Sequence, residues 1–328
     1  MRPIKKILVA VKDLDAKASP EVAKAAQLAK ALGAELEIFH AIDTPVYFDL
    51  YGDGRGNLAK IEKQQLGKQQ AKLERIARRV HRHDVAVSTR ADWDYPSHEA
   101  ILRRAKATDA DLIVVQVHRG HRGLRWLMRS TDWELLKLSP VPVLLVRTPR
   151  PYLHPRVLAA VDPARSHAKP ARLNAEILGL AAKFSTALRG SLSAMHAYIP
   201  PSATELTLFA PGVPSITIGS DAMAEKHAIS ALRRSVAKFQ IPAQRRHVLG
   251  QHPIEAIPKL TKTLKVSILV MGALSRSGLK RVFIGNTAEQ IIDAIACDIL
   301  IVRPAHIELK KIPDARAGMP LYTQPMPY

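Results

Sequence analysis

The residues best suited to chemistry lie in a glycine-containing loop in the last quarter of the chain. This loop, residues 272–287, contains Gly272, Ser275, Gly278, Gly285, Asn286 and Thr287. Glycine lets the backbone approach a phosphate group closely and adopt a positive φ. Asn286 and Thr287 open an apolar-periodic segment, so their N–H groups lie where a helix begins and attract anions. The spacing predicts a phosphate-binding loop, to which Arg276, Lys280 and Arg281 add positive charge.

The flanking segments place this loop at one edge of a parallel sheet. Short apolar runs end at Val161, near His196 and at Gly272, and each predicts a strand. In open parallel sheets, ligands bind at the carboxyl ends of strands where the strand order reverses. Asp162, directly after the first of these runs, can accept a hydrogen bond from an amino group or a ribose hydroxyl. His196 is expected to be a hydrogen-bonded structural residue.

The chain repeats its own pattern once. Val11 corresponds to Val161 at an offset of 150 residues, and Val146 corresponds to Val302 at an offset of 156. Apolar runs alternate with helical segments in both halves, which is typical of a parallel sheet covered on both faces. We therefore predict an α/β fold of two tandem doubly wound Rossmann-like domains, each with a five-stranded parallel sheet.

The predicted elements of the two halves follow the same order. Strands are expected at residues 6–11, 35–41, 84–90, 111–117 and 141–147, and again at 156–161, 190–198, 245–249, 266–272 and 298–303. Helices are expected at 20–32, 57–83, 96–107 and 131–138, and again at 171–188, 221–239, 253–264 and from 287 onward.

Prolines divide the chain into three parts. Pro149, Pro151 and Pro155 break helix and strand alike and indicate a stiff linker. The predicted domains are residues 1–148 and 156–304. Residues 305–328 form a Pro-rich tail, which we expect to be a draped or disordered arm.

These features together resemble the universal stress protein family, in particular its tandem two-domain E-type members. The resemblance rests on KILVAV and RVLAAVD at the two domain starts, on STDWELLKLSPVPVLLVR, and on VMGALSRSGLKRVFIGNTAEQIIDAIACDILIVRP. Nucleotide-binding members carry a glycine, two residues, a second glycine, nine residues, then a glycine and Ser or Thr. Gly272 and Gly285 match the first and third glycines, whereas Ser275 and Asn286 stand at the second glycine and the Ser/Thr position.

The resemblance implies an ATP-type nucleotide in the second domain, accompanied by Mg²⁺. It places the adenine-contacting aspartate at Asp162 and a second-strand backbone contact near Ala197. The nucleotide-binding set is then Asp162, Ala197, Gly272, Ser275, Gly278, Gly285, Asn286 and Thr287. The fifth strands of the resembled family pair across domains, so a pseudo-dimer within the chain and a homodimer of chains are both expected.

The first half departs from this pattern at the corresponding positions. Lys12 stands at the position of Asp162, and Gln116 at that of Gly272. Arg119, Arg129 and Ser130 replace Ser275, Gly285 and Asn286. We therefore predict that the first domain does not bind nucleotide in the same way. Its basic loop, residues 118–129, either binds another anion or is a solvated surface.

Composition limits the remaining choices. The net charge is +20, from 49 Lys and Arg against 29 Asp and Glu, and it attracts polyanions. The single cysteine, Cys297, excludes an intramolecular disulfide and is expected to be a buried thiol. No segment reaches the roughly 20 apolar residues of a transmembrane helix. We expect a cytoplasmic protein without membrane insertion.

Three functions remain open at this point. The leading hypothesis is a stress-response protein that binds ATP or a related nucleotide and acts by regulation rather than fast catalysis. The alternatives are a slow ATPase, and a nucleotide-independent scaffold or polyanion-binding protein, with nucleic acid the less favoured partner. No residue spacing indicates a catalytic nucleophile or a metal-ligand cluster.

Overall fold

The computed structural model describes residues 3–43, 55–81, 84–117, 131–163, 172–200, 221–272 and 286–303. They fall into two compact units, residues 3–152 and 153–303. Each unit is an α/β layered structure built on a parallel sheet, which confirms the predicted fold class.

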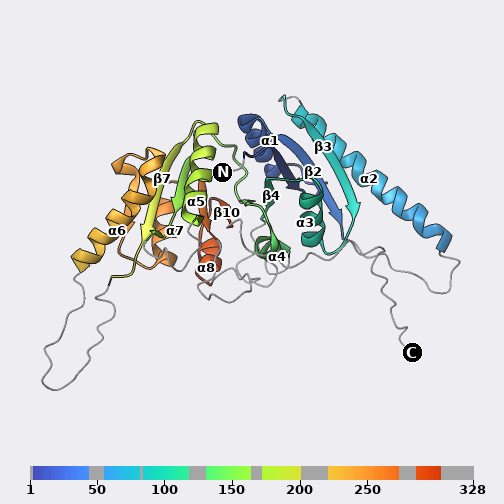
Figure 1. Ribbon diagram of the computed structural model, residues 1–328. Coiled ribbons are helices and arrows are strands. Elements are labelled where there is room, and N and C mark those ends of the chain that lie inside the picture. Colours follow the sequence, from blue (N-terminus) through green and yellow to red (C-terminus); the bar gives the residue numbers. More distant parts are fainter. Residues whose placement is uncertain are drawn as a thin grey trace, which may run out of the picture. The chain divides into compact units, whose positions relative to one another are not determined.

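The sheet of the first unit has the strand order β3-β2-β1-β4-β5. Its elements are β1 (Lys6–Ala10), α1 (Pro20–Leu32), β2 (Glu35–Ile42), α2 (Arg55–His81), β3 (Val87–Trp93), α3 (Ser97–Ala107), β4 (Leu112–Gln116), α4 (Thr131–Leu138) and β5 (Val143–Val146). Right-handed crossovers between parallel strands put α1 and α2 on one face, and α3 and α4 on the other. In Figure 1, β2 and β3 run between α2 and α3.

The second unit repeats this topology with the strand order β10-β9-β6-β7-β8. Its elements are β6 (Arg156–Ala160), α5 (Leu173–Ala187), β7 (Ser191–Ala197), α6 (Asp221–Val236), β8 (Arg246–Leu249), α7 (Pro253–Thr263), β9 (Ile268–Gly272), α8 (Asn286–Ala294) and β10 (Asp298–Val302). Short 3-10 turns cover Ala237–Phe239 and Ala243–Arg245.

The central strands are buried on both faces, as their continuous apolar sequences predict. Ile7, Leu8 and Val9 of β1 have no exposed surface, and neither have Ile268, Leu269 and Val270 of β9. Cys297 is a free thiol and is buried, as expected.

Two local expectations differ from the structure. β3 begins at Val87 and continues to Trp93, later than the predicted 84–90, because its pairing with β2 depends on backbone groups and continues through the polar Asp92. Ser19 precedes α1 as predicted, but its side chain makes no capping hydrogen bond, and Pro20 at the first helical position leaves one N–H fewer to cap. Gly33 ends α1 with φ of 65°, as predicted.

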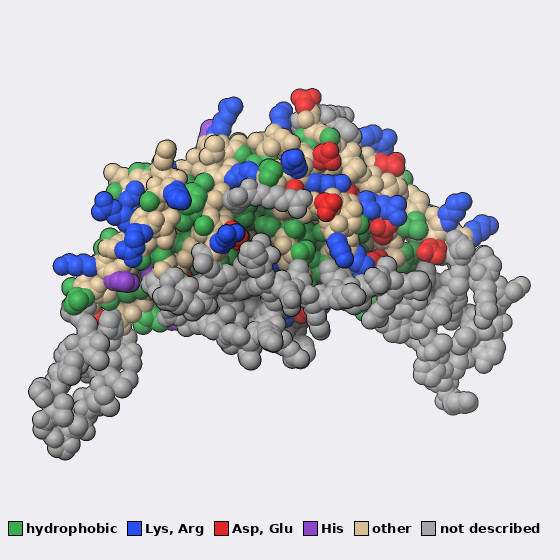
Figure 2. All heavy atoms as spheres, in the orientation of Figure 1, with side chains coloured by type: hydrophobic (Ala, Val, Ile, Leu, Met, Phe, Trp, Pro, Cys, Tyr) green, Lys and Arg blue, Asp and Glu red, His purple; other side chains and the backbone are tan. Residues whose placement is uncertain are grey.

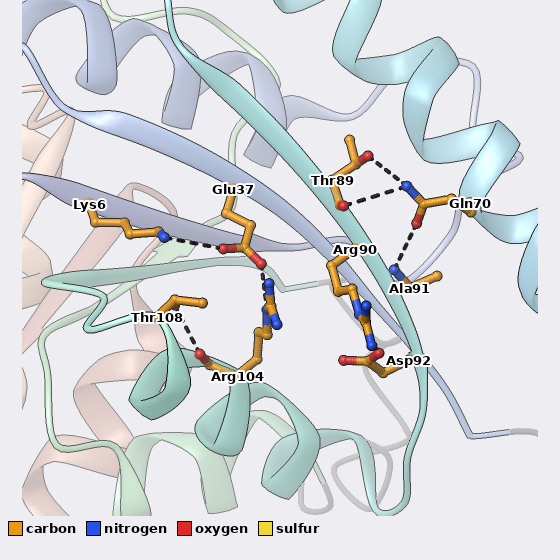
Figure 3. Close-up of polar contacts among 9 residues, drawn as sticks. All are labelled: Lys6, Glu37, Gln70, Thr89, Arg90, Ala91, Asp92, Arg104 and Thr108. Carbon is orange, nitrogen blue, oxygen red and sulfur yellow. Dashed lines mark hydrogen bonds and ion pairs between the residues drawn. The ribbon is translucent and has the colours of Figure 1, made fainter.

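Polar contacts tie the outer helices of the first unit to its strands (Figure 3). The Glu37 carboxylate in β2 is 1% exposed and accepts a 2.5 Å hydrogen bond from Arg104 Nε of α3. Gln70 of α2 accepts from the Ala91 N–H at 3.1 Å and donates to Thr89 Oγ1 at 2.8 Å. These bonds fix α2 against β3.

The segment after β5 is bound to α1. Lys24 is 1% exposed, and its Nζ donates to Thr148 O and Thr148 Oγ1, both at 2.7 Å. Gln27 donates to Tyr152 O at 2.6 Å and accepts from the Tyr152 N–H at 2.9 Å. The start of the proline-containing linker is therefore held on the first unit.

Candidate functional site

The switch point of the second unit lies between β6 and β9. From β6 the chain proceeds through β7 to β8 on one side, and then places β9 and β10 on the other. Ala160 of β6 aligns with Met195 of β7 and with Met271 of β9, so the three strands end within two residues of one another. The next residues along these strands therefore meet at one sheet edge, where ligands bind in open α/β folds.

Asp162 occupies this edge and is held by the first turn of α5. Its N–H donates to Asn174 Oδ1 at 3.2 Å, and Asn174 Nδ2 donates to Asp162 O at 3.1 Å. Because this contact uses only backbone groups of Asp162, the helix positions the residue without engaging its carboxylate. Asn174 is not among the residues predicted from the sequence, although an Asn at a helix start, twelve residues after the strand-end aspartate, is a usable signal.

His196 lies next to Val161 and Asp162. Its ring is 1% exposed, and Nδ1 lies 3.3 Å from Val161 O and 3.8 Å from Asp162 Oδ1. The Asp162 side chain is 29% exposed. The histidine is thus a buried structural residue, as expected, while the carboxylate is partly open to solvent.

Ala197 is the last residue of β7, and its neighbour Tyr198 completes this part of the edge. The Tyr198 N–H donates to Leu249 O at 2.9 Å. Burial, and then the carboxylates of Glu225 and Asp221, raise the pKa of the Tyr198 hydroxyl. Tyr198 is not among the predicted site residues, although an aromatic residue at the end of a strand was visible in the sequence.

Gly272 ends β9 and is closely packed against α5. A Cβ at this position would lie 2.9 Å from Leu173 Cδ2 and 3.4 Å from Ile177 Cδ1, both in α5. The bare Cα lets α5 cross the end of β9 at close range, and it leaves the backbone of Gly272 without a side chain at the edge.

The structure describes only some of the remaining predicted site residues. Ser275, Gly278 and Gly285 lie outside the described residues. Asn286 is the first residue of α8, and Thr287 is half-buried in its first turn. The structure therefore brings Asp162, Ala197 and Gly272 to one edge.

The first unit carries different residues at the equivalent positions. Ala10 of β1 aligns with Val115 of β4, as Ala160 aligns with Met271, so Gln116 corresponds to Gly272 and Lys12 to Asp162. His40 Nδ1 lies 2.8 Å from Val11 O, which repeats the contact of His196 with Val161. The supporting histidine is thus common to both units, whereas the predicted ligand-facing residues are not.

Comparison with known proteins identifies the origin of this duplicated fold. A family model described as the universal stress protein family matches residues 3–147 and again 155–303. The chain belongs to the universal stress protein family. Universal stress protein E of Escherichia coli (strain K12) is 30% identical over 226 residues, which cover 67% of this chain and 69% of that protein. The protein of the same name from Salmonella typhi gives the same values.

Solved structures of this family share the tandem architecture. A universal stress protein from Pseudomonas aeruginosa UCBPP-PA14 superposes with a TM-score of 0.70 at 22% identity, covering 93% of this chain and 95% of that one. One from Archaeoglobus fulgidus DSM 4304 gives a TM-score of 0.60 at 14% identity, covering 92% and 97%. At these identities the likeness establishes the fold.

The described residues also bear on surface charge, metal binding and membrane insertion. Figure 2 shows Lys and Arg side chains scattered over the described part of one face, with Asp and Glu among them. Within the described ranges, no group of three or more His, Cys, Asp or Glu side chains is placed to hold a metal ion. No helix among them is long and apolar enough to cross a membrane.

Proposed function

We propose that this member of the universal stress protein family is a cytoplasmic binding protein that holds ATP or a related adenine nucleotide in its second domain, residues 156–304. The observation that carries the proposal is the placement of Asp162 and Gly272 on either side of the switch point. Membership in a family whose nucleotide-binding members have a glycine loop after this strand supports it.

The residues present fit an adenine nucleotide. The partly exposed Asp162 carboxylate is an acceptor for the adenine amino group or a ribose hydroxyl. Gly272 presents backbone without a side chain. We assign the phosphates to the segment containing Ser275, Gly278, Gly285, Asn286 and Thr287, which combines glycines with a helix start.

Magnesium would enter with the phosphates. Mg²⁺ is usually held by one or two carboxylates together with phosphate oxygens and water, so a dedicated protein cage is not needed. The activity that we propose is binding and regulation rather than fast hydrolysis.

Isothermal titration calorimetry with ATP and Mg²⁺ tests this function. We expect one nucleotide per chain and loss of binding in Gly285→Arg, which copies the arginine at position 129 of the first half. The matched control is Arg129→Gly, which should leave the stoichiometry at one. An absence of heat and of a thermal shift at millimolar ATP would reject the proposal.

A further inference from the structure

A cavity of about 710 Å³ opens on the first unit between α1, α2 and the loop that follows β1. Neither Lys12 nor Gln116 lines it, so it is separate from the sheet edge equivalent to the proposed nucleotide site. A volume of this size is within the range of about 300–1,000 Å³ found for sites of small organic molecules.

One stripe from each of two helices builds the walls. α1 contributes positions 22, 23, 26, 27 and 30, and α2 contributes positions 72, 75, 76, 79 and 80. Residues three and four apart share one helix face, so each set forms a continuous stripe along its helix. The cavity is therefore a groove between two helices, and residues of the loop after β1 complete its lining.

The inner part of this groove is apolar. Val22, Ala26 and Val80 line it and are each no more than 6% exposed, and Ile76 beside them is half-buried. Small side chains on α1 leave the space, because Ala23 and Ala26 stand where longer side chains would fill it. This floor suits the ring or chain of an organic molecule.

The outer part of the groove is strongly basic. Five cationic side chains line it, namely Lys17, Lys30, Lys72, Arg75 and Arg79. The single carboxylate in the lining, Asp15, accepts a 2.6 Å bond from Lys72 Nζ. Arg75 and Arg79 lie one turn apart on α2, where like charges repel each other. An anion bound between them would relieve that repulsion.

The helix that carries Lys72, Arg75 and Arg79 is anchored to the sheet. Gln70, two residues before Lys72, bonds to Thr89 and to the backbone of Ala91 in β3 (Figure 3). α2 is thereby anchored to the sheet next to the groove. The cationic side chains consequently extend from a rigid element, which lowers the ordering cost of binding.

We propose that this groove binds a small organic phosphate, a molecule that joins an apolar ring to a group with two negative charges. The ring lies on the apolar floor, and the phosphate lies among Lys30, Arg75 and Arg79, since Arg pairs with phosphate in a bidentate manner. The buried apolar floor distinguishes the site from a polyanion track, which needs a continuous open basic surface. This ligand is additional to the nucleotide proposed for the second domain.

Calorimetry with 1-naphthyl phosphate on the full chain tests the groove. We expect micromolar binding that weakens at least tenfold in the double variant Arg75→Glu, Arg79→Glu. The matched control is Lys68→Glu, Arg78→Glu, which makes the same charge change at exposed α2 positions outside the lining. The control should retain binding within twofold. Equal loss in both double variants would mean that charge alone attracts the probe, and the proposal would be wrong.

Two further measurements separate the groove from other sites. Ala23→Trp fills the groove without a change of charge and should abolish binding, with circular dichroism showing an intact fold. Asp162→Ala should leave naphthyl phosphate binding unchanged, whereas a loss would place the probe in the second domain and overturn the assignment. Binding of a single-stranded oligonucleotide through Arg75 and Arg79, without binding of naphthyl phosphate, would also overturn it.

Discussion

The two units share a topology but differ at the switch point. In both, a histidine at the end of the second strand contacts the carbonyl of the first-strand residue, through His40 in one and His196 in the other. At the strand ends next to this histidine, the first unit carries Lys12 and Gln116, and the second unit carries Asp162 and Gly272. The supporting histidine contact is thus the same in both units, whereas the positions that we predict to face the ligand differ.

The first helices of the two units also differ, at positions inside the core. Gly33 and Arg189 end these helices with positive φ and equivalent backbone bonds, so counting back from them aligns Glu21 with Ile177 and Lys24 with Leu180. All four side chains are buried. The first unit thus carries two ionisable groups where the second is apolar, and one of them, Lys24, binds the linker.

The largest expected effect comes from copying the first unit into the second with Gly272→Gln. The new side chain would meet Leu173 at the end of β9 and cover the proposed site. We expect ATP affinity to fall at least a thousandfold, which corresponds to about 4 kcal/mol. Calorimetry measures it, with Gln116→Gly as the matched variant that should gain no second site. Retained binding in Gly272→Gln would remove Gly272 from the assignment.

Glu21 offers the next largest effect, on pH dependence. Burial, and then the nearby Asp13 carboxylate, raise its pKa from 4.5 to about 7, although a backbone hydrogen bond acts in the opposite direction. The folded chain therefore keeps a proton that the unfolded chain releases, and stability falls as the pH rises from about 4.5 through 7.

Glu21→Gln removes this dependence. At pH 8 we expect it to stabilise the first unit by on the order of 3 kcal/mol, and at pH 4 to change little. Urea unfolding, followed by hydrogen exchange in α1, measures both. Glu62→Gln, an exposed site on α2 with the same charge change, is the control. The same pH profile in wild type and Glu21→Gln would contradict the assignment of the proton to Glu21.

Lys24→Met should destabilise the first unit by about 2 kcal/mol, because it removes the buried hydrogen bonds from Lys24 Nζ to Thr148 O and Thr148 Oγ1. Leu180→Met at the equivalent position of α5 should cost no more than about 1 kcal/mol, since it keeps apolar volume. Hydrogen exchange of residues 148–152 is the direct readout. Unchanged protection there in Lys24→Met would show that Lys24 does not hold the linker.

The smallest effect is expected for Asn174→Ala, at about 1 kcal/mol in the second unit. It removes both side-chain bonds to the backbone of Asp162. If Asn174 positions Asp162, the ATP affinity of Asn174→Ala should fall severalfold. The ATP affinity of Asn174→Asp should fall less, because aspartate keeps one acceptor. A thermal shift assay with and without ATP separates the two contributions, and an unaltered affinity would limit Asn174 to a role in stability.

Much of the fold was predictable from local patterns. Continuous β-branched runs such as residues 6–11 and 298–303 predict strands because burial on both faces demands apolar side chains at every position. Gly33 predicted a helix end since a positive φ favours glycine. The edge strand β3 was placed too early, because its later residues are polar and are held by backbone pairing with β2. The placement of Asp162 and Gly272 near each other followed from the topology of open sheets.

By itself, the sequence determined the duplication, the fold class and the residues that differ between the two halves, because these depend on periodicity and on the order of the segments. Its motifs also carried the resemblance to the family. Only the tertiary structure decided which distant residues meet. It revealed that Asn174 holds Asp162, that Lys24 binds the linker, and that two helix stripes enclose a basic groove on the first unit. Such contacts depend on how helices pack against a sheet, and neither composition nor local spacing encodes that packing.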